Sequence, residues 1–112
     1  MPKPRVTYDT VRRLALTLPG VEEGSSYGTA ALKIKGKLLL RLHDDGDKIV
    51  LRMPFERREE LMSGDPKTYF ITEHYREYPW VLVSLKEIHP DALPDLLQLA
   101  FRAASPTKKR RV

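Results

Sequence analysis

Apolar residues recur at helical spacing near the start of the chain. They follow the i, i+3, i+4, i+7 pattern of one helical face at Val11, Leu14, Ala15 and Leu18. Thr7 precedes this pattern and has the short hydroxyl side chain that favours a helix N-cap. Because Pro19-Gly20 interrupts the pattern, we expect an amphipathic first helix that ends before this dipeptide.

The hydrophobic period changes to two between Ser25 and Met53. Such alternation is typical of half-buried antiparallel strands. The positions expected to face the helices are Leu38, Leu40, Leu42, Ile49, Leu51 and Met53, and Leu32 and Ile34 alternate in the same way. Gly36 and the segment Asp44-Asp45-Gly46-Asp47 have the chemistry of tight turns, which predicts two hairpins at these places.

The second half of the chain predicts a short helix over 55–62, strands over 69–72 and 80–85, and a last amphipathic helix. That helix starts after His89-Pro90-Asp91, has Pro94 in its first turn, and ends at Ser105-Pro106. We expect Trp80 and Phe101 to be largely buried and to connect the late strand with the last helix. The predicted order is α-β-β-β-β-α-β-β-α, a single α+β domain whose mostly antiparallel sheet has helices packed on one face.

Composition places the chain among small globular domains. With 112 residues and no cysteine, it has room for one domain (core about 6–105, basic tail 106–112) and no disulfide or thiolate metal site. No apolar run approaches the roughly 20 residues of a membrane span. The first five residues are not followed by the apolar core of a signal peptide. We therefore expect a cytoplasmic monomer that does not bind membranes.

The net charge of +5 is concentrated at the two chain ends. Lys108, Lys109, Arg110 and Arg111 supply four positive charges and Lys3 and Arg5 another two, so that residues 6–107 carry 14 basic and 15 acidic side chains. The basic tail is typical of a nucleic-acid arm and equally of a solvated chain end.

Basic side chains are also expected on the sheet face opposite the helices. Period two sends to that face Lys33, Lys35, Arg41, His43, Lys48 and Arg52, with no acidic residue inside the strands. Such a face could lie along DNA phosphates, and each neutralised phosphate would release counterions. The alternative is a solvated strand face that only keeps the protein soluble.

Catalytic and metal-binding patterns are missing from the sequence. The three histidines, His43, His74 and His89, lie on different predicted elements, and no serine stands in Gly-x-Ser-x-Gly. The glycines form neither a phosphate loop nor a dinucleotide fingerprint. We therefore predict a protein that is not an enzyme and uses no metal or cofactor.

Six ring residues crowd into positions 69–80: Tyr69, Phe70, His74, Tyr75, Tyr78 and Trp80. Rings at this density could form a stacking surface or a small-molecule pocket, for which Tyr75, Tyr78 and Trp80 are the candidates. Alternatively, Phe70 and Trp80 are core residues and the tyrosines cover the sheet edge.

Several short motifs, in this order and spacing, resemble the MmcQ/YjbR family of small bacterial proteins. They are Leu18-Pro19-Gly20-Val21-Glu22-Glu23, then Tyr27-Gly28, the 32–37 hairpin, the 49–53 strand and Tyr78-Pro79-Trp80-Val81, and the resemblance covers about residues 8–106. It implies a frataxin-like (CyaY-like) α+β fold and DNA binding through a double-wing arrangement of strands. The acidic iron-binding ridge of frataxin-like proteins is not matched, because the first helix has Arg12 and Arg13 and a single acid, Asp9.

The leading prediction is a small non-enzymatic protein that contacts the phosphates of duplex DNA without sequence specificity. Its candidate contacts are Lys33, Lys35, Lys37, Arg41, Lys48, Arg52, Lys108, Lys109, Arg110 and Arg111. The alternative is a protein- or small-molecule-interaction module that uses the aromatic segment 69–80 and binds no nucleic acid. A continuous positive face favours the first prediction, and a pocket lined by Tyr75, Tyr78 and Trp80 favours the second.

Overall fold

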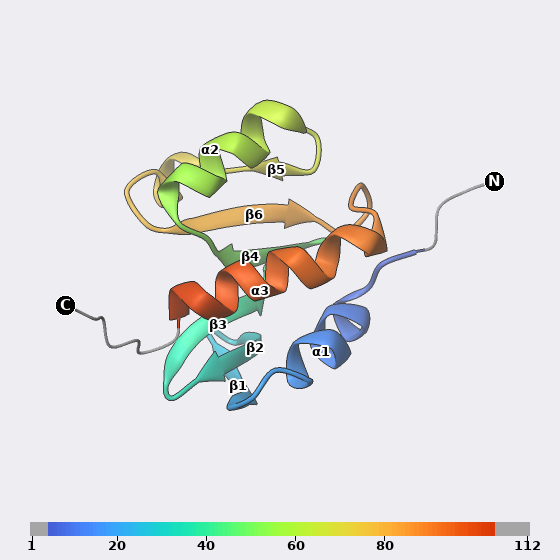
Figure 1. The fold of residues 1–112 in the computed structure, drawn as a ribbon, viewed down its shortest axis with the longest axis vertical. Helices are drawn as coiled ribbons and strands as arrows, with labels where there is room; N and C mark the ends of the chain where they lie inside the picture. The colour runs from blue at the N-terminus through green and yellow to red at the C-terminus, as the bar shows by residue number, and fades with distance from the viewer. Residues whose placement is uncertain (1–4, 105–112) are drawn as a thin grey trace.

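The computed structural model describes residues 5–104, which form one α+β domain (Figure 1). The elements are α1 (Tyr8–Leu16), β1 (Val21–Ser26), β2 (Thr29–Ile34), β3 (Lys37–Leu42), β4 (Lys48–Arg52), α2 (Phe55–Gly64), β5 (Tyr69–Phe70), β6 (Trp80–Ser84) and α3 (Leu93–Ala104). Two 3₁₀ turns, η1 (Glu73–Tyr75) and η2 (Pro90–Ala92), precede β6 and α3. The predicted order of helices and strands is confirmed.

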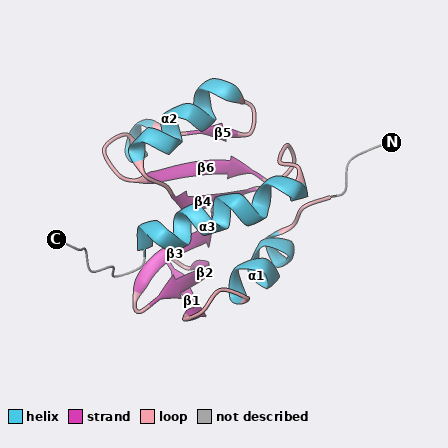
Figure 2. Cartoon of the chain, in the orientation of Figure 1, coloured by secondary structure: helices cyan, strands magenta, loops and turns pink. Residues whose placement is uncertain are grey.

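The six strands form one antiparallel sheet in the order β1-β2-β3-β4-β6-β5. Helices α1 and α3 lie together on one face, with α3 crossing β3 and β4 (Figure 1). Helix α2 packs beside β5 and β6 at the other end of the sheet, where the irregular segment between these two strands also lies (Figure 2). None of the helices in the described part of the chain is long and apolar enough to cross a membrane.

Local sequence explains where the elements begin and turn. Thr7 caps α1 through a capping box with Thr10, as its hydroxyl side chain predicted. The turn between β2 and β3 consists of Lys35 and Gly36, both with positive φ, as in a type I′ hairpin turn. The strand β1 begins at Val21, earlier than the pattern change at Ser25, because this edge strand is mostly polar and exposed and so lacks a hydrophobic alternation.

A β-bulge in β3, opposite β2, changes which of its residues face the core. Leu32 pairs with Leu40 and Lys33 with Leu38, which leaves Leu39 as an extra residue in β3. Leu39 is therefore fully buried in the core, whereas Leu38 lies on the face away from the helices. The prediction that Leu38 faces the helices was wrong because period two does not continue through a bulge.

Trp80 also lies on the face away from α1 and α3. It pairs with Arg52, one position from the inward-facing Val81, and is half-buried rather than largely buried. Phe101 is half-buried and packs against the core. The predicted packing of Trp80 on the last helix was wrong, because the alternation of β6 turns this large ring to the other side.

Candidate functional site

The sheet face opposite α1 and α3 has an apolar centre. Ala31, Arg41, Val50 and Leu82 form one cross-strand row on this face, and all four are buried. The three apolar side chains of this row interrupt any continuous basic surface. The segment between β5 and β6 lies over the same face, since Tyr75 from η1 meets Arg41 there.

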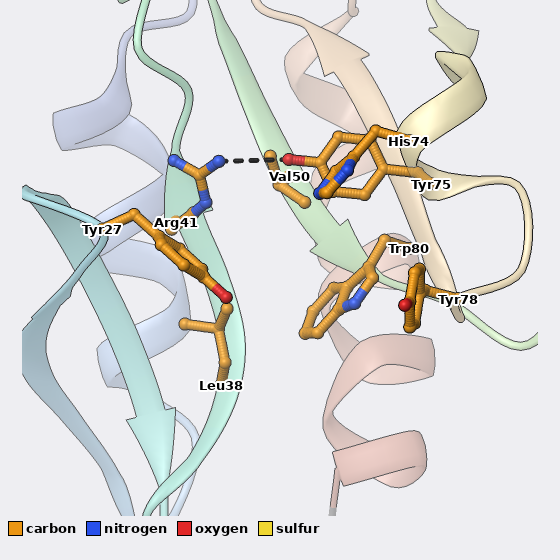
Figure 3. A pocket seen from close by; sticks show the side chains of 8 residues that line it. All are labelled: Tyr27, Leu38, Arg41, Val50, His74, Tyr75, Tyr78 and Trp80. Carbon is orange, nitrogen blue, oxygen red and sulfur yellow. Dashed lines mark hydrogen bonds between the residues drawn. The ribbon is translucent and has the colours of Figure 1, made fainter.

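A pocket of about 340 Å³ opens on this face (Figure 3). It is lined by Tyr27, Leu38, Arg41, Val50, His74, Tyr75, Tyr78 and Trp80. Figure 3 shows Tyr27 and Arg41 on one side and the rings of the segment 74–80 on the other. The turn after β1, the sheet and the β5–β6 segment thus each contribute one wall.

Arg41 is the charged group at the centre of this lining. Its side chain is only 8% exposed, and its Nη1 donates to Thr29 Oγ1 (3.3 Å) and the Leu42 carbonyl (3.2 Å). Its Nη2 donates to the phenol oxygen of Tyr75 at 3.1 Å. The carboxylate of Asp44 lies 3.5 Å from Nη1 but is 75% exposed. These contacts fix the guanidinium, so it is not free to follow a DNA backbone.

Arg52 is likewise used inside the protein. Its Nε donates to the Leu38 carbonyl at 2.8 Å, and its guanidinium lies over the ring of Trp80, 4.6 Å from the centroid. Burial lowers the pKa of Arg52. The contact fixes the indole of Trp80 against the sheet.

Arg58 of α2 organises the segment that carries the aromatic wall. Its Nη1 lies 2.8–3.2 Å from the carbonyl oxygens of Tyr75, Tyr78 and Trp80, and its Nη2 donates to the Arg76 carbonyl at 3.0 Å. The residue is 4% exposed. Because these carbonyls belong to an irregular segment, one buried guanidinium supplies hydrogen bonds that a strand or helix would otherwise provide.

Tyr27 reaches the pocket from the two-residue turn between β1 and β2. Its φ is +52° and that of Gly28 is +80°, so both central positions are left-handed. The residue is 85% exposed, and the guanidinium of Arg41 lies 5.2 Å from the centroid of its ring. Two features therefore hold Tyr27 in the pocket wall: the backbone of the turn, and the contact between one face of its ring and Arg41.

The remaining basic candidates do not form one surface. Lys48 pairs with Asp45 and His43 lies 3.4 Å from the same carboxylate, whose pKa falls to about 2, chiefly through its hydrogen bond with Lys48. Lys33 lies on the pocket side of the sheet, Lys35 is in the turn, and Lys37 shares the helix side with Ile34. Lys108, Lys109, Arg110 and Arg111 lie outside the described residues.

The structure brings the three aromatic candidates together and adds residues that the sequence analysis missed. Tyr75, Tyr78 and Trp80 line one pocket together with His74 of the same predicted segment, and the missed members are Tyr27, Leu38 and Val50. The dipeptide Tyr27-Gly28 carried a signal, because a two-residue turn there folds β1 onto β2. Within residues 5–104, no group of three His, Asp or Glu side chains is placed to hold a metal ion.

Comparison with known proteins places the chain in a family. Its fold is similar to the crystal structure of the Deinococcus radiodurans protein DR2400, which has a DUF419 domain, with a TM-score of 0.73 and 24% identity over 90% of this chain and 80% of that chain. None of the curated proteins matches significantly. The model of the YjbR family matches residues 16–103, from the end of α1 almost to the end of α3, and the chain therefore belongs to the YjbR family.

Proposed function

We propose that this protein binds a small molecule with a planar ring in the pocket lined by Tyr27, Tyr75, Tyr78 and Trp80. The observation that carries the proposal is the aromatic lining of a 340 Å³ pocket around one buried cation, Arg41. A few polar groups in a concave, mainly apolar lining are typical of small-molecule sites. The volume lies at the small end of the usual range, about 300–1,000 Å³, which suits a mono- or bicyclic ligand.

The aromatic lining favours a ligand with a flat ring over a ligand with a flexible chain. Aromatic side chains attract other rings in stacked or edge-to-face arrangements, beyond the gain from buried apolar area. His74 already packs edge-on against Tyr75, with ring centroids 4.8 Å apart. A planar ligand would extend this ring cluster toward Val50 and Leu38.

Rigidity of the walls further supports binding. Arg58 holds the backbone of 75–80, and Arg52 holds the ring of Trp80. A preformed pocket loses less conformational entropy when a ligand enters. The proposal assigns binding and no chemical step to the site.

The test uses Trp80, the single tryptophan of the chain. Its indole N–H gives one identifiable signal in a ¹H–¹⁵N spectrum, and the probes are indole and 2-naphthol. We expect this signal to shift in a saturable way as either probe is added. A signal that does not move up to millimolar probe concentrations would contradict the proposal.

Two aromatic substitutions give a matched control. Tyr78 lines the pocket and is 55% exposed, whereas Phe55 on α2 is 46% exposed and does not line it. We expect Tyr78→Leu to weaken probe binding and Phe55→Leu, which keeps an apolar side chain beside Arg58, to leave it unchanged. Equal effects would show that the probes bind aromatic surface generally.

A second candidate function, binding to phosphates of duplex DNA, is supported by the hairpin of β2 and β3. Lys33, Lys35 and Lys37 have no ion-pair partner among residues 5–104, and Lys35 and Lys37 are exposed at the tip. Exposed lysines at the tip of this hairpin could contact phosphates without using Arg41 or Arg52. This candidate is independent of the pocket.

A salt titration with duplex DNA tests it. We expect Lys35→Glu with Lys37→Glu to reduce the slope of log affinity against log salt by about two units on B-DNA. Lys67 is also exposed but lies between α2 and β5, away from this hairpin, so Lys67→Glu should leave the slope unchanged. The same variants without residues 105–112 remove the contribution of the basic tail. If the parent lacking 105–112 does not bind DNA even at about 50 mM salt, this candidate fails.

A further inference from the structure

We infer that the ligand is a planar aromatic anion whose ring lies between Tyr27 and Trp80 and whose negative group meets Arg41. The inference rests on the proposed ring-binding function. It adds the charge of the ligand and names the residue that contacts the charged group. Figure 3 shows Tyr27 and Trp80 on opposite sides of the pocket, with Arg41 above Tyr27.

Charges around the pocket favour an anion. Arg41 lines it, and no carboxylate is among the described lining residues. The hydroxyl oxygen of Tyr75 accepts from Arg41, which leaves its own O–H as a further donor in the lining. Hydrogen-bond donors in the lining can pair with acceptor groups of an anionic ligand. Because Arg41 is buried, its attraction to a negative group is stronger than it would be in water.

Arg41 retains donor capacity after its protein contacts are counted. Its guanidinium has five N–H donors. Nη1 and Nη2 contact Thr29, Leu42 and Tyr75, whereas Nε has no acceptor among the described residues. Asp44 neutralises the charge only weakly, because it is 75% exposed and stands at 3.5 Å. A carboxylate in the pocket would supply the missing acceptor.

A cationic ligand fits this site poorly. Clusters of aromatic rings can bind quaternary ammonium groups through the negative faces of the rings. Here the guanidinium of Arg41 already lies over the ring of Tyr27 and that of Arg52 over Trp80. Both cations would repel a positively charged ligand.

Tyr27 stands at a turn position where an aromatic side chain is unusual, and its place in the pocket lining gives that ring a role. Type I′ turns favour Asn, Asp or Gly at this position, because φ is positive. Tyr27 adopts φ +52° there although the residue is 85% exposed, so little burial offsets the backbone cost. Lys35 holds the same position in the other two-residue turn, at φ +50°, without lining the pocket.

Three naphthalene probes with the same ring system test the charge: 2-naphthoate, 2-naphthalenemethanol and 2-naphthylmethylammonium. We expect 2-naphthoate to bind about tenfold more tightly than the ammonium compound, with the alcohol between them. Arg41→Met should remove the preference. Equal affinities for all three probes would overturn the inference but leave ring binding intact. If none binds, both proposals fail.

Variants in the turns at Tyr27 and Lys35 test the inference without substituting the buried Arg41. Tyr27→Asn should weaken 2-naphthoate binding at least about fivefold without lowering the melting temperature, because Asn suits the left-handed position and only the ring wall is lost. Lys35→Asn should leave affinity unchanged. Unaltered 2-naphthoate affinity in Tyr27→Asn would overturn the proposed position of the ring.

Discussion

Arg41 on β3 donates a hydrogen bond to the phenol oxygen of Tyr75, 34 residues later in the chain, at 3.1 Å. The contact connects the centre of the sheet with the irregular segment between β5 and β6. It also joins two residues that line the same pocket. The shape of this pocket thus depends on a side-chain contact as well as on the strands.

The first prediction removes the acceptor of this bond. Tyr75→Phe keeps the ring but deprives a buried cation of one hydrogen-bond partner, while Thr29 and Leu42 continue to bind Nη1. We expect a loss of about 1–2 kcal/mol in the free energy of unfolding, measured by urea denaturation. Unchanged stability would mean that the bond contributes nothing in solution.

The second prediction concerns Arg58. Arg58→Met should lower the free energy of unfolding by about 3 kcal/mol or more, because the carbonyl oxygens of Tyr75, Arg76, Tyr78 and Trp80 lose their shared donor. Thermal and urea unfolding measure the change.

The neighbouring Arg57 provides the control for this experiment. Its side chain is 56% exposed and forms an exposed ion pair with Glu60. Arg57→Met should therefore change stability by no more than about 0.5 kcal/mol. Similar losses in the two variants would refute the role assigned to Arg58.

The third prediction compares two residues of β6 on the pocket side. Leu82 is 1% exposed, so Leu82→Ala should cost about 2–5 kcal/mol. Trp80 is half-buried beside the pocket, so Trp80→Ala should cost less, roughly 1–2 kcal/mol. A Trp80→Ala variant that is less stable than Leu82→Ala would place the indole in the core after all.

The fourth prediction is a pH dependence at the turn between β3 and β4. Lys48 and the Asp47 amide hold the pKa of Asp45 down from 3.8 to about 2. A lowered carboxyl pKa contributes stability above about pH 4 that is lost as pH falls toward 2.

Asp45→Asn tests this contribution, because the amide oxygen can still accept from the Asp47 N–H. The variant should be less stable than the parent by at most about 1 kcal/mol at pH 7, since the Asp45 side chain is 37% exposed. The difference should shrink as the pH falls through the folded-state pKa of about 2 and be absent near about pH 1. A difference of unchanged size at about pH 1 would point to the turn geometry and not to charge.

Hydrophobic periodicity and turn chemistry predicted the fold well. The order of helices and strands, the Thr7 cap and the Gly36 hairpin are local features, and each has a local signal. The bulge at Leu39 has none, because it depends on how β2 and β3 pair. One extra residue moved Leu38 from the predicted core to the pocket.

The candidate site was predicted only in part for the same reason. Tyr75, Tyr78 and Trp80 are close in sequence, and their ring density was visible. Tyr27 comes from a distant turn and joins them through tertiary packing. Arg41 was placed on the correct face, but its burial depends on Tyr75, Thr29 and the covering segment.

The most direct test of ring binding in this pocket is a measurement of nuclear Overhauser effects between bound 2-naphthoate and the protein. Trp80 is the single tryptophan, so its indole protons are assigned without ambiguity. We expect effects from the naphthalene protons to the indole of Trp80 and to the ring of Tyr27. Effects confined to other residues, or their absence under saturating 2-naphthoate, would contradict ring binding in this pocket.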